Sequence, residues 1–435
     1  MASSLASLRR MALRGTSRWR LSTAHFSKDY WTFFAAAFCM DFGLGLFFFL
    51  FNLYLTDLGF NERTIGHVMA SLTLGNVVGT IPATMIVRRY GMGPLLSITF
   101  LCAPVLCVLR VLVLWGPAQY GLAFATGMAL CGWPICFSPT IAKLTREDNR
   151  AMGFSMAFAT GIGLGTLSGL AGGYIPELLH MSPLHTTLVQ GIRVVLVFAC
   201  VVTFSGVWPL MRITSELRTV PARRSTRLFH PYLIRFLPPF MLWSMVAGSF
   251  PLFGAIYLQK SLGLPLGSLG AVFSASQLAQ FCAVLLAPLL LKRLGIAKGV
   301  AAIQIGTAAF LLLISYSRTA SLGVCFYVLY FAMQYMCGPG IYNLLMDNIA
   351  EAERSTASAV QNISGALCQA GSAAVTGICI VAFGYRDLLI ANAVTAVLAS
   401  FLFLLLGMNR QKAPIADETR ISSCKPDDVA DCMEV

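Results

Sequence analysis

The segment LYLTDLGFNERTIG at residues 53–66 decides the fold prediction, because a related segment, IYLQKSLGLPLGSLG, follows at residues 256–270. Two glycines of the first segment, Gly59 and Gly66, return in the second as Gly263 and Gly270, at one offset of 204 residues. Further pairs keep this offset: Arg89 and Arg293, Gly91 and Gly295, Arg150 and Arg354, and Gly161 and Gly365. Because the pairs fall at turns and helix starts, they indicate two halves built on one plan.

The composition is that of a membrane protein. Of the 435 residues, 57% are apolar and 11% are charged, and the mean hydropathy is +0.74, whereas soluble domains are about 25% charged. A membrane-spanning helix needs about 20 mainly apolar residues. Twelve windows qualify: 30–56, 63–87, 94–115, 119–143, 150–175, 187–211, 233–259, 266–291, 296–316, 321–346, 354–381 and 386–408. We therefore predict an all-α integral membrane protein of twelve transmembrane helices, arranged as two six-helix bundles in parallel repeat.

Polar segments divide the chain into five parts. A basic tail at 1–29 precedes an N-terminal bundle at 30–211, a linker at 212–232, a C-terminal bundle at 233–408 and a polar tail at 409–435. The first tail is rich in Arg, which suits either a cytoplasmic tail or a transit peptide for an organelle.

Lys and Arg gather on one side of the predicted membrane. Of the 31, 25 fall in the tails, the linker and alternate turns, and only Arg63, Lys260, Arg318 and Arg386 fall in the opposite loops. The positive-inside rule places both termini and 212–232 in the cytoplasm of a plasma or inner membrane, or in the matrix if the first tail is a transit peptide. This bias accounts for the net charge of +13, so we expect no nucleic-acid partner.

Residues that carry enzyme chemistry are sparse. Eleven of the thirteen Cys lie in apolar runs without the spacing of zinc ligands, and the five His lie at helix ends or in loops. We find no HExxH, no G-x-S-x-G with a partner acid and no phosphate-binding loop. We therefore predict no catalytic residues, no metal and no cofactor. An intramembrane hydrolase or acyltransferase is the disfavoured alternative, because it would need a clustered nucleophile, acid or base.

The repeat, the basic turns after the second and eighth spans, and the Arg that opens the fifth and eleventh spans resemble the major facilitator superfamily over about 30–410. Six loop residues match the family's cytoplasmic motifs: Arg89, Gly91, Arg293, Gly295, Arg150 and Arg354. The turn TMIVRRYGMG departs from the family pattern, with Arg88 in place of an Asp and Met92 in place of a basic residue. Leu170 also replaces a proline of the antiporter motif, which argues against a typical drug/proton antiporter.

This resemblance implies a secondary transporter that moves a small solute by alternating access. Proton coupling, as symport or antiport, is our preferred hypothesis, and a uniporter for facilitated diffusion or a lipid flippase of the same fold are the alternatives. The expected partners are the solute, a proton and membrane lipids, around a monomeric chain.

In this family the first, fourth, seventh and tenth spans line the central cavity. With one polar residue from the eighth span, the implied cavity candidates are Asn52, Trp133, Trp243, Gln277, Gln334, Tyr335 and Asn343. Helix-breaking residues lie at similar positions in the fourth and tenth spans, at Pro134, Pro139, Gly338, Pro339 and Gly340. They are either gate elements or kinks in packed helices. Arg110 and Arg193 lie near the ends of their spans, where we expect long side chains to snorkel.

Asp41 is the acid placed deepest in the predicted membrane. It lies eleven residues into the first span, roughly 16 Å along a helix and near the middle of a layer of about 30 Å. A carboxylate there costs on the order of 3 kcal/mol, so it should face the bundle interior. It either forms a structural hydrogen bond, to Asn76 or a freed carbonyl, or serves as the site for a coupled proton or a cationic solute.

Overall fold

The computed structural model describes residues 26–146, 149–181, 187–213, 231–349 and 354–408, and the regular structure in these ranges is helical. The helices of the first half are α2 (Lys28–Asp57), α3 (Glu62–Tyr90), α4 (Met92–Leu112), α5 (Gly116–Leu130), α6 (Gly132–Leu144), α7 (Arg150–Met181), α8 (Leu188–Ser205) and α9 (Val207–Met211). Those of the second half are α10 (Pro231–Gly248), α11 (Phe250–Lys260), α12 (Leu266–Leu294), α13 (Ile296–Ser315), α14 (Ala320–Met346) and α15 (Arg354–Met408). Most of the predicted basic tail and linker, and all of the polar tail at 409–435, lie outside the described residues.

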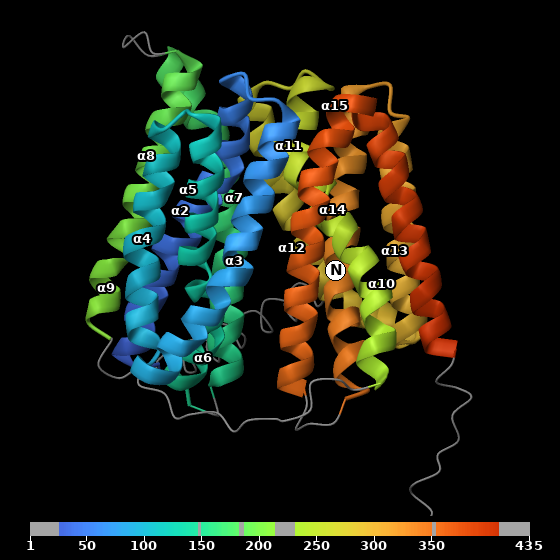
Figure 1. The fold of residues 1–435 in the computed structure, drawn as a ribbon, viewed down its shortest axis with the longest axis horizontal. Helices are drawn as coiled ribbons and strands as arrows, with labels where there is room; N and C mark the ends of the chain where they lie inside the picture. Colours follow the sequence, from blue (N-terminus) through green and yellow to red (C-terminus); the bar gives the residue numbers. More distant parts are fainter. Residues whose placement is uncertain (1–25, 147–148, 182–186, 214–230, 350–353, 409–435) are drawn as a thin grey trace, which may run out of the picture.

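Eleven helical segments of the described chain are long and apolar enough to cross a membrane. The count differs from the predicted twelve at one place, because the predicted spans 354–381 and 386–408 both fall in α15. Within α15, Gly384 leaves helical geometry with a φ of 83° and a ψ of 174°. Glycine adopts this positive φ without the steric cost that other residues meet. The long element therefore consists of two helices joined at a kink, and Figure 1 shows the chain turning back there.

The backbone repeats at the positions that the sequence offset predicts. Gly59 and Gly263 have φ values of 86° and 66°, and Gly91 and Gly295 have φ values of 92° and 80°. In each pair the glycine lies in the turn between two successive long helices. The two halves thus share turn geometry as well as sequence, as a parallel repeat requires.

The helices form two bundles that lie beside each other in Figure 1. The N-terminal bundle contains α2–α9 and the C-terminal bundle contains α10–α15. Two helix pairs provide most of the contact between the bundles, α3 with α15 and α7 with α12. We call the end that carries the turns at Gly91 and Gly295 the basic end, because Arg88, Arg89, Lys292 and Arg293 lie beside those turns.

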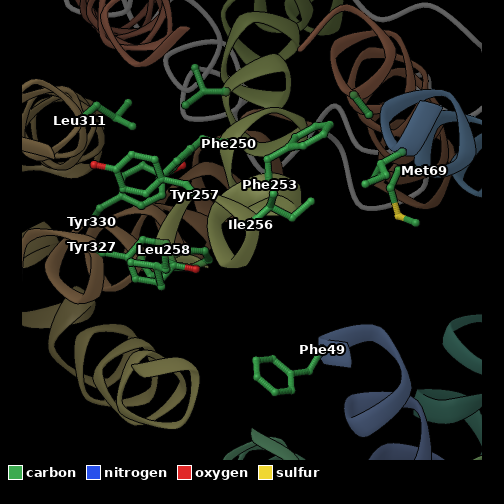
Figure 2. Close-up of a cluster of buried hydrophobic side chains, with 14 of the residues drawn as sticks. Phe49, Met69, Phe250, Phe253, Ile256, Tyr257, Leu258, Leu311, Tyr327 and Tyr330 are labelled. Carbon is green, nitrogen blue, oxygen red and sulfur yellow. The ribbon is translucent and has the colours of Figure 1, made fainter. Parts of the chain in front are cut away.

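Aromatic side chains fill the interior of the C-terminal bundle. Phe250 on α11 lies with its ring centroid 5.5 Å from that of Tyr330 and 6.0 Å from that of Tyr327, both on α14. Figure 2 shows these rings gathered with Tyr257, while Phe49 of the N-terminal bundle lies apart from them. Full burial of such side chains contributes about 1.5–3 kcal/mol each in water. In a bilayer the corresponding gain comes mainly from close packing, because lipid tails are themselves apolar.

Three predicted spans are each divided into two helices. The fourth divides at Cys131 between α5 and α6 and the sixth at Gly206 between α8 and α9, and both residues keep helical φ and ψ. The seventh divides at Ser249 between α10 and α11, and there the chain leaves helical geometry. Ser249 has a φ of −95° and a ψ of −97°, and its hydroxyl donates to Oδ1 of Asn392 on α15 at 2.8 Å. By contrast, α14 runs without interruption through Pro339, so the expected break at 338–340 is a proline within a continuous helix.

The predicted topology can be tested by cysteine labelling in intact cells, on a background that lacks native Cys. A cysteine at position 318 should react with a membrane-impermeant thiol reagent added outside, and one at position 224 should not, because the positive-inside rule puts them on opposite sides. Permeabilised cells provide the control, since both positions should then react. Labelling of position 224 in sealed cells would overturn the topology.

Candidate functional site

The two bundles are joined at one end by polar contacts between α2, α3 and α7 on one side and α11 and α12 on the other. Nζ of Lys260 lies 2.7 Å from Oε1 of Glu62. Nε2 of Gln259 donates to Oδ1 of Asp57 at 2.9 Å. The backbone N–H of Gly267 donates to Oε1 of Glu177 at 2.6 Å. In all three contacts an acid of the N-terminal bundle accepts from the C-terminal bundle, so we call this the sealed end.

Small residues let the helices approach closely beside these polar contacts. A Cβ built on Gly173 would lie 2.9 Å from Cα of Gly270, and a Cβ on Gly270 would meet the carbonyl oxygen of Gly169. On the α3–α15 side, a Cβ on Gly66 would lie 2.6 Å from the carbonyl oxygen of Ala373. Contacts between small residues are what hold helices together in lipid. Deeper in the same interface, the hydroxyl of Ser274 donates to the carbonyl of Thr166 at 2.7 Å.

Nearer the basic end, a cavity of about 730 Å³ opens between the bundles. Its lining comes from α7, α12 and α14: Phe154, Ser155, Phe158, Ala159, Gly161, Ile162, Gln277, Gln280, Phe281, Val284, Leu285 and Tyr335. Four of these side chains are aromatic and two are amides, and among these described lining residues none is Lys, Arg or His. The cavity therefore combines apolar walls with a few polar groups, which is the usual make-up of a small-molecule site.

Asp41 lies next to this cavity, behind Gly161. A Cβ built on Gly161 would lie 3.3 Å from Oδ2 of Asp41, so the missing side chain leaves space beside the carboxyl group. The side chain of Trp133 is hydrogen-bonded to Asp41, and its indole N–H is the donor because Trp has no acceptor. Asp41 is only partly buried. The mid-span acid therefore lies on the interior side of α2 with one neutral partner and the cavity beside it.

Trp133 is held in place by neighbouring rings. It lies at the start of α6, two residues after Cys131, where the fourth span divides. Its ring centroid lies 5.1 Å from that of Phe137, 5.7 Å from that of Phe100 and 6.0 Å from that of Phe33. Aromatic pairs at these separations contribute about 0.5–1.5 kcal/mol each beyond their buried area. The indole is thus fixed on three sides, with its N–H directed to Asp41.

Residues 33–373 match the model of the Major Facilitator Superfamily. The chain belongs to this superfamily. Comparison with curated protein sequences gives no match.

Solved structures of several transporters share the fold of this chain. The nucleoside transporter NupG is 15% identical with a TM-score of 0.70, over 88% of this chain and 99% of its own. A bacterial homologue of the human lysosomal transporter Spinster, in an inward-facing and unoccupied conformation, is 14% identical with a TM-score of 0.70, over 89% and 98%. A D-xylose–proton symporter is 15% identical with a TM-score of 0.67, over 86% and 96%. These likenesses confirm the predicted fold, and the family, which the match over residues 33–373 shows, points to a multi-pass membrane transporter rather than to an enzyme.

The structure brings three of the predicted cavity residues of this chain to one place. Gln277 and Tyr335 line the cavity, and Trp133 bonds to Asp41 beside it. Gln277 also crosses between the bundles, since a Cβ on Gly165 would lie 2.6 Å from its Nε2. Tyr335 is 51% exposed although its helix spans the membrane, which suits a ring at the cavity wall.

The other four cavity candidates lie elsewhere. Asn52 takes part in closing the sealed end, where its Nδ2 donates to the carbonyl of Leu252 at 3.0 Å. Trp243 and Gln334 are buried inside the C-terminal bundle, and Asn343 is exposed in the last turn of α14.

The predicted gate and loop residues have mixed surroundings. Pro134 and Pro139 are exposed on α6, and a Cβ on Gly340 would lie 2.6 Å from Val300. A Cβ on Gly338 meets no atom within 4 Å. In the loop motif, the Arg89 guanidinium lies 5.3 Å from the ring centroid of Tyr90. Arg150 and Arg354 each begin a helix, α7 and α15, as the repeat predicts.

Arg110 differs from the expectation of a snorkelling side chain. It is fully buried in the N-terminal bundle, and its guanidinium lies 4.2 Å from the ring centroid of Phe51 and 5.8 Å from that of Phe47. Its three guanidinium nitrogens lack a hydrogen-bond acceptor among the described residues. Cation–π attraction replaces part of the lost hydration. This burial could not be predicted from the pattern of α4, because most of its residues are apolar and no face stands out as the interior one.

The glycine contacts predict how the seal responds to mutation. Gly270→Ala should press a methyl group against the carbonyl of Gly169 and weaken the seal by about 1–3 kcal/mol, as overpacking does. A cysteine at position 274, on a background without native Cys, should then react faster with an impermeant reagent added from the sealed end.

Gly163→Ala is the matched control, because a Cβ at Gly163 on α7 meets no atom within 4 Å. Equal reactivity of position 274 in both variants would show that the Gly169–Gly270 approach does not maintain the seal.

Proposed function

We propose that this protein is a secondary active transporter that moves a small solute by alternating access and couples the movement to protons through Asp41. The observation that carries the proposal is the position of Asp41, a mid-span carboxyl group beside a cavity that both bundles line. The cavity lies toward the basic end, while acids and glycines close the other end. A molecule with one open and one sealed end has the geometry of one state in an alternating-access cycle.

The chemistry of the cavity supports a neutral or cationic solute. Its lining carries amides and aromatic rings, and the nearest charged group that we place beside it is the carboxyl group of Asp41. An aromatic ring attracts a cation over its face, and a carboxylate does so more strongly at short range. An anionic solute would meet no cationic partner among the described lining residues. The solute therefore has an apolar body with polar or positively charged groups.

Asp41 suits proton coupling because its surroundings change as the bundles move. With the basic end open, water and solute reach the region of Gly161, and a proton can exchange with that side. Closing the cavity removes this water, and the hydrogen bond from Trp133 remains. A carboxyl group whose charged form becomes more costly on closure binds its proton more readily there. Uptake or release of the proton is thereby linked to which end is open.

The interrupted helices supply places where the bundles can bend. Ser249 leaves helical geometry in the seventh span, and Cys131 divides the fourth span two residues before Trp133. Hinges in conformational changes are a few terminal or loop residues that absorb a change in φ and ψ. Bending at these points would change the access of water to Asp41 and Trp133 while their hydrogen bond remains, so the proton site responds to the movement of the bundles.

Asp41→Asn tests the coupling step. The amide keeps the shape and the hydrogen bond from Trp133 but does not titrate, so accumulation driven by a pH gradient should be lost while solute exchange is retained. The assay compares the two activities in vesicles of purified protein, with solutes first found by a thermal-shift screen, because a bound solute stabilises the folded state.

Asp29→Asn is the matched control, because Asp29 lies in the first turn of the same helix. Unchanged pH-driven accumulation in Asp41→Asn would show that Asp41 does not carry the coupled proton, whereas the lack of any pH-driven accumulation in the native protein would leave uniport as the account of the fold.

Pro339→Ala tests whether the proline in α14 serves movement. Proline removes a helix hydrogen bond, so alanine should restore the bond and stiffen α14 where Tyr335 lines the cavity. We expect the transport rate to fall while the melting temperature stays the same or rises. Pro288→Ala is the matched control, since Pro288 lies exposed inside α12. Normal transport by Pro339→Ala at wild-type expression would make the proline a packing feature only.

A further inference from the structure

A second concave site lies on the side of the C-terminal bundle, between α12 and α14. It has a volume of about 460 Å³, and its lining is Ala283, Leu286, Leu289, Leu290, Arg293, Leu329, Ala332, Met333 and Met336. Eight of these nine residues are apolar, and the ninth is Arg293. Leu286 and Leu289 are 55% and 61% exposed, on a helix of membrane-spanning length. We call this site the α12–α14 groove.

The groove has the depth of one lipid leaflet. From Ala283 to Arg293 the chain advances ten residues along α12, which is about 15 Å at a rise of about 1.5 Å per residue. The hydrocarbon layer of a bilayer is about 30 Å thick, so this length is about half of it. Arg293 is the second-last residue of α12, two residues before the turn glycine Gly295. The groove therefore runs from the membrane surface at the basic end to about the middle of the bilayer.

The charge at the mouth of the groove is positive and uncompensated by the described acids. The ion pair that the structure records in its described residues joins Lys260 of α11 to Glu62 of α3 at the sealed end, whereas Arg293 lies at the basic end of α12. The guanidinium offers five N–H donors in a planar fork that matches a phosphate. Beneath it the groove offers only apolar contacts. A single molecule that satisfies both parts has an anionic head and a long apolar tail.

We propose that the α12–α14 groove binds an anionic phospholipid of the leaflet at the basic end, with its phosphate on Arg293 and one acyl chain along Leu286, Leu289 and Met333. The apolar tail excludes free phosphate as the ligand of the whole groove. The net negative head distinguishes this lipid from a zwitterionic one, because the ammonium of phosphatidylcholine offsets its own phosphate.

The groove and the solute cavity share walls. On α12, Leu285 lines the cavity and Leu286 lines the groove, and on α14 the same holds for Tyr335 and Met336. A lipid chain held in the groove packs against the outer faces of both helices. It therefore supports the α12–α14 wall of the cavity from the membrane side.

The proposal can be tested with the purified full-length chain in detergent. Dioleoylphosphatidylglycerol and dioleoylphosphatidylcholine are titrated separately, and bound copies are counted by native mass spectrometry alongside the shift in melting temperature. We expect tighter binding and a larger shift with phosphatidylglycerol. Arg293→Gln should reduce the preference about fivefold, since one basic residue near an anionic lipid surface contributes on the order of that factor.

Lys292→Gln is the matched control, because Lys292 carries the same charge at the same helix end but does not line the groove. Ala332→Phe is a second variant that fills the groove and leaves Arg293 in place, and it should reduce the binding of both lipids. Equal affinity for the two lipids, or equal losses in Arg293→Gln and Lys292→Gln, would overturn the proposal. A melting shift with glycerol phosphate as large as with the intact lipid would also overturn it, because the acyl chain would then contribute nothing.

Discussion

The close approach of the two bundles at the sealed end is the constraint on which the rest of the structure depends. Gly169, Gly173 and Gly270 bring α7 and α12 into backbone contact, and Gly66 does the same for α3 and α15. Around these contacts, Asp57, Glu62 and Glu177 accept from groups of the other bundle. Packing of small residues supplies adhesion in lipid, whereas an ion pair such as Lys260–Glu62, with Lys260 42% exposed, contributes at most about 1 kcal/mol. Close packing of small residues therefore contributes most of the stability of the sealed end, and the acids align the two bundles with each other. Toward the basic end the space between α7 and α12 forms the cavity.

This arrangement of the bundles allows a carboxyl group to lie at mid-span. The energetic cost of Asp41 in a bilayer forces it inward, and the absence of a side chain at Gly161 leaves room beside it on the cavity side. Its partner Trp133 lies at the start of α6 and is positioned by three neighbouring rings. We infer that the carboxyl group, the start of α6 and the cavity act together, because moving any one of them changes the water around the other two. On the opposite side of α12, the proposed lipid groove supports the wall that this cavity needs.

The sequence predicted the repeat and the family, because each depends on spacing along the chain. The offset of 204 residues anticipated the matching positive φ values of Gly59 with Gly263 and of Gly91 with Gly295.

The sequence did not predict which side chains share the cavity. A span such as α2 is apolar on every face, so periodicity does not reveal how the helix is rotated, and Asn52 proved to face the sealed end. The departure from helical geometry at Ser249 was not predicted, although Gly248 precedes it and Pro251 lies at the start of α11. Arg110 was expected to snorkel because burial without an acceptor is costly and rare. Proline at 339 suggested a break, yet α14 is continuous through it.

Distance measurement between spin labels at the two ends tests the central claim most directly. One label pair at Arg63 and Arg318 would report on the sealed end, and a second pair at Arg88 and Leu294 would report on the basic end, each joining the two bundles on a background without native Cys. Distances are recorded by pulsed electron resonance in lipid nanodiscs at acidic and at neutral pH, for the native Asp41 and for Asp41→Asn. The account predicts that the two distance distributions shift in opposite directions with pH, and that the shift disappears in Asp41→Asn. Distributions that move together, or that shift with pH equally well without the carboxyl group, would contradict it.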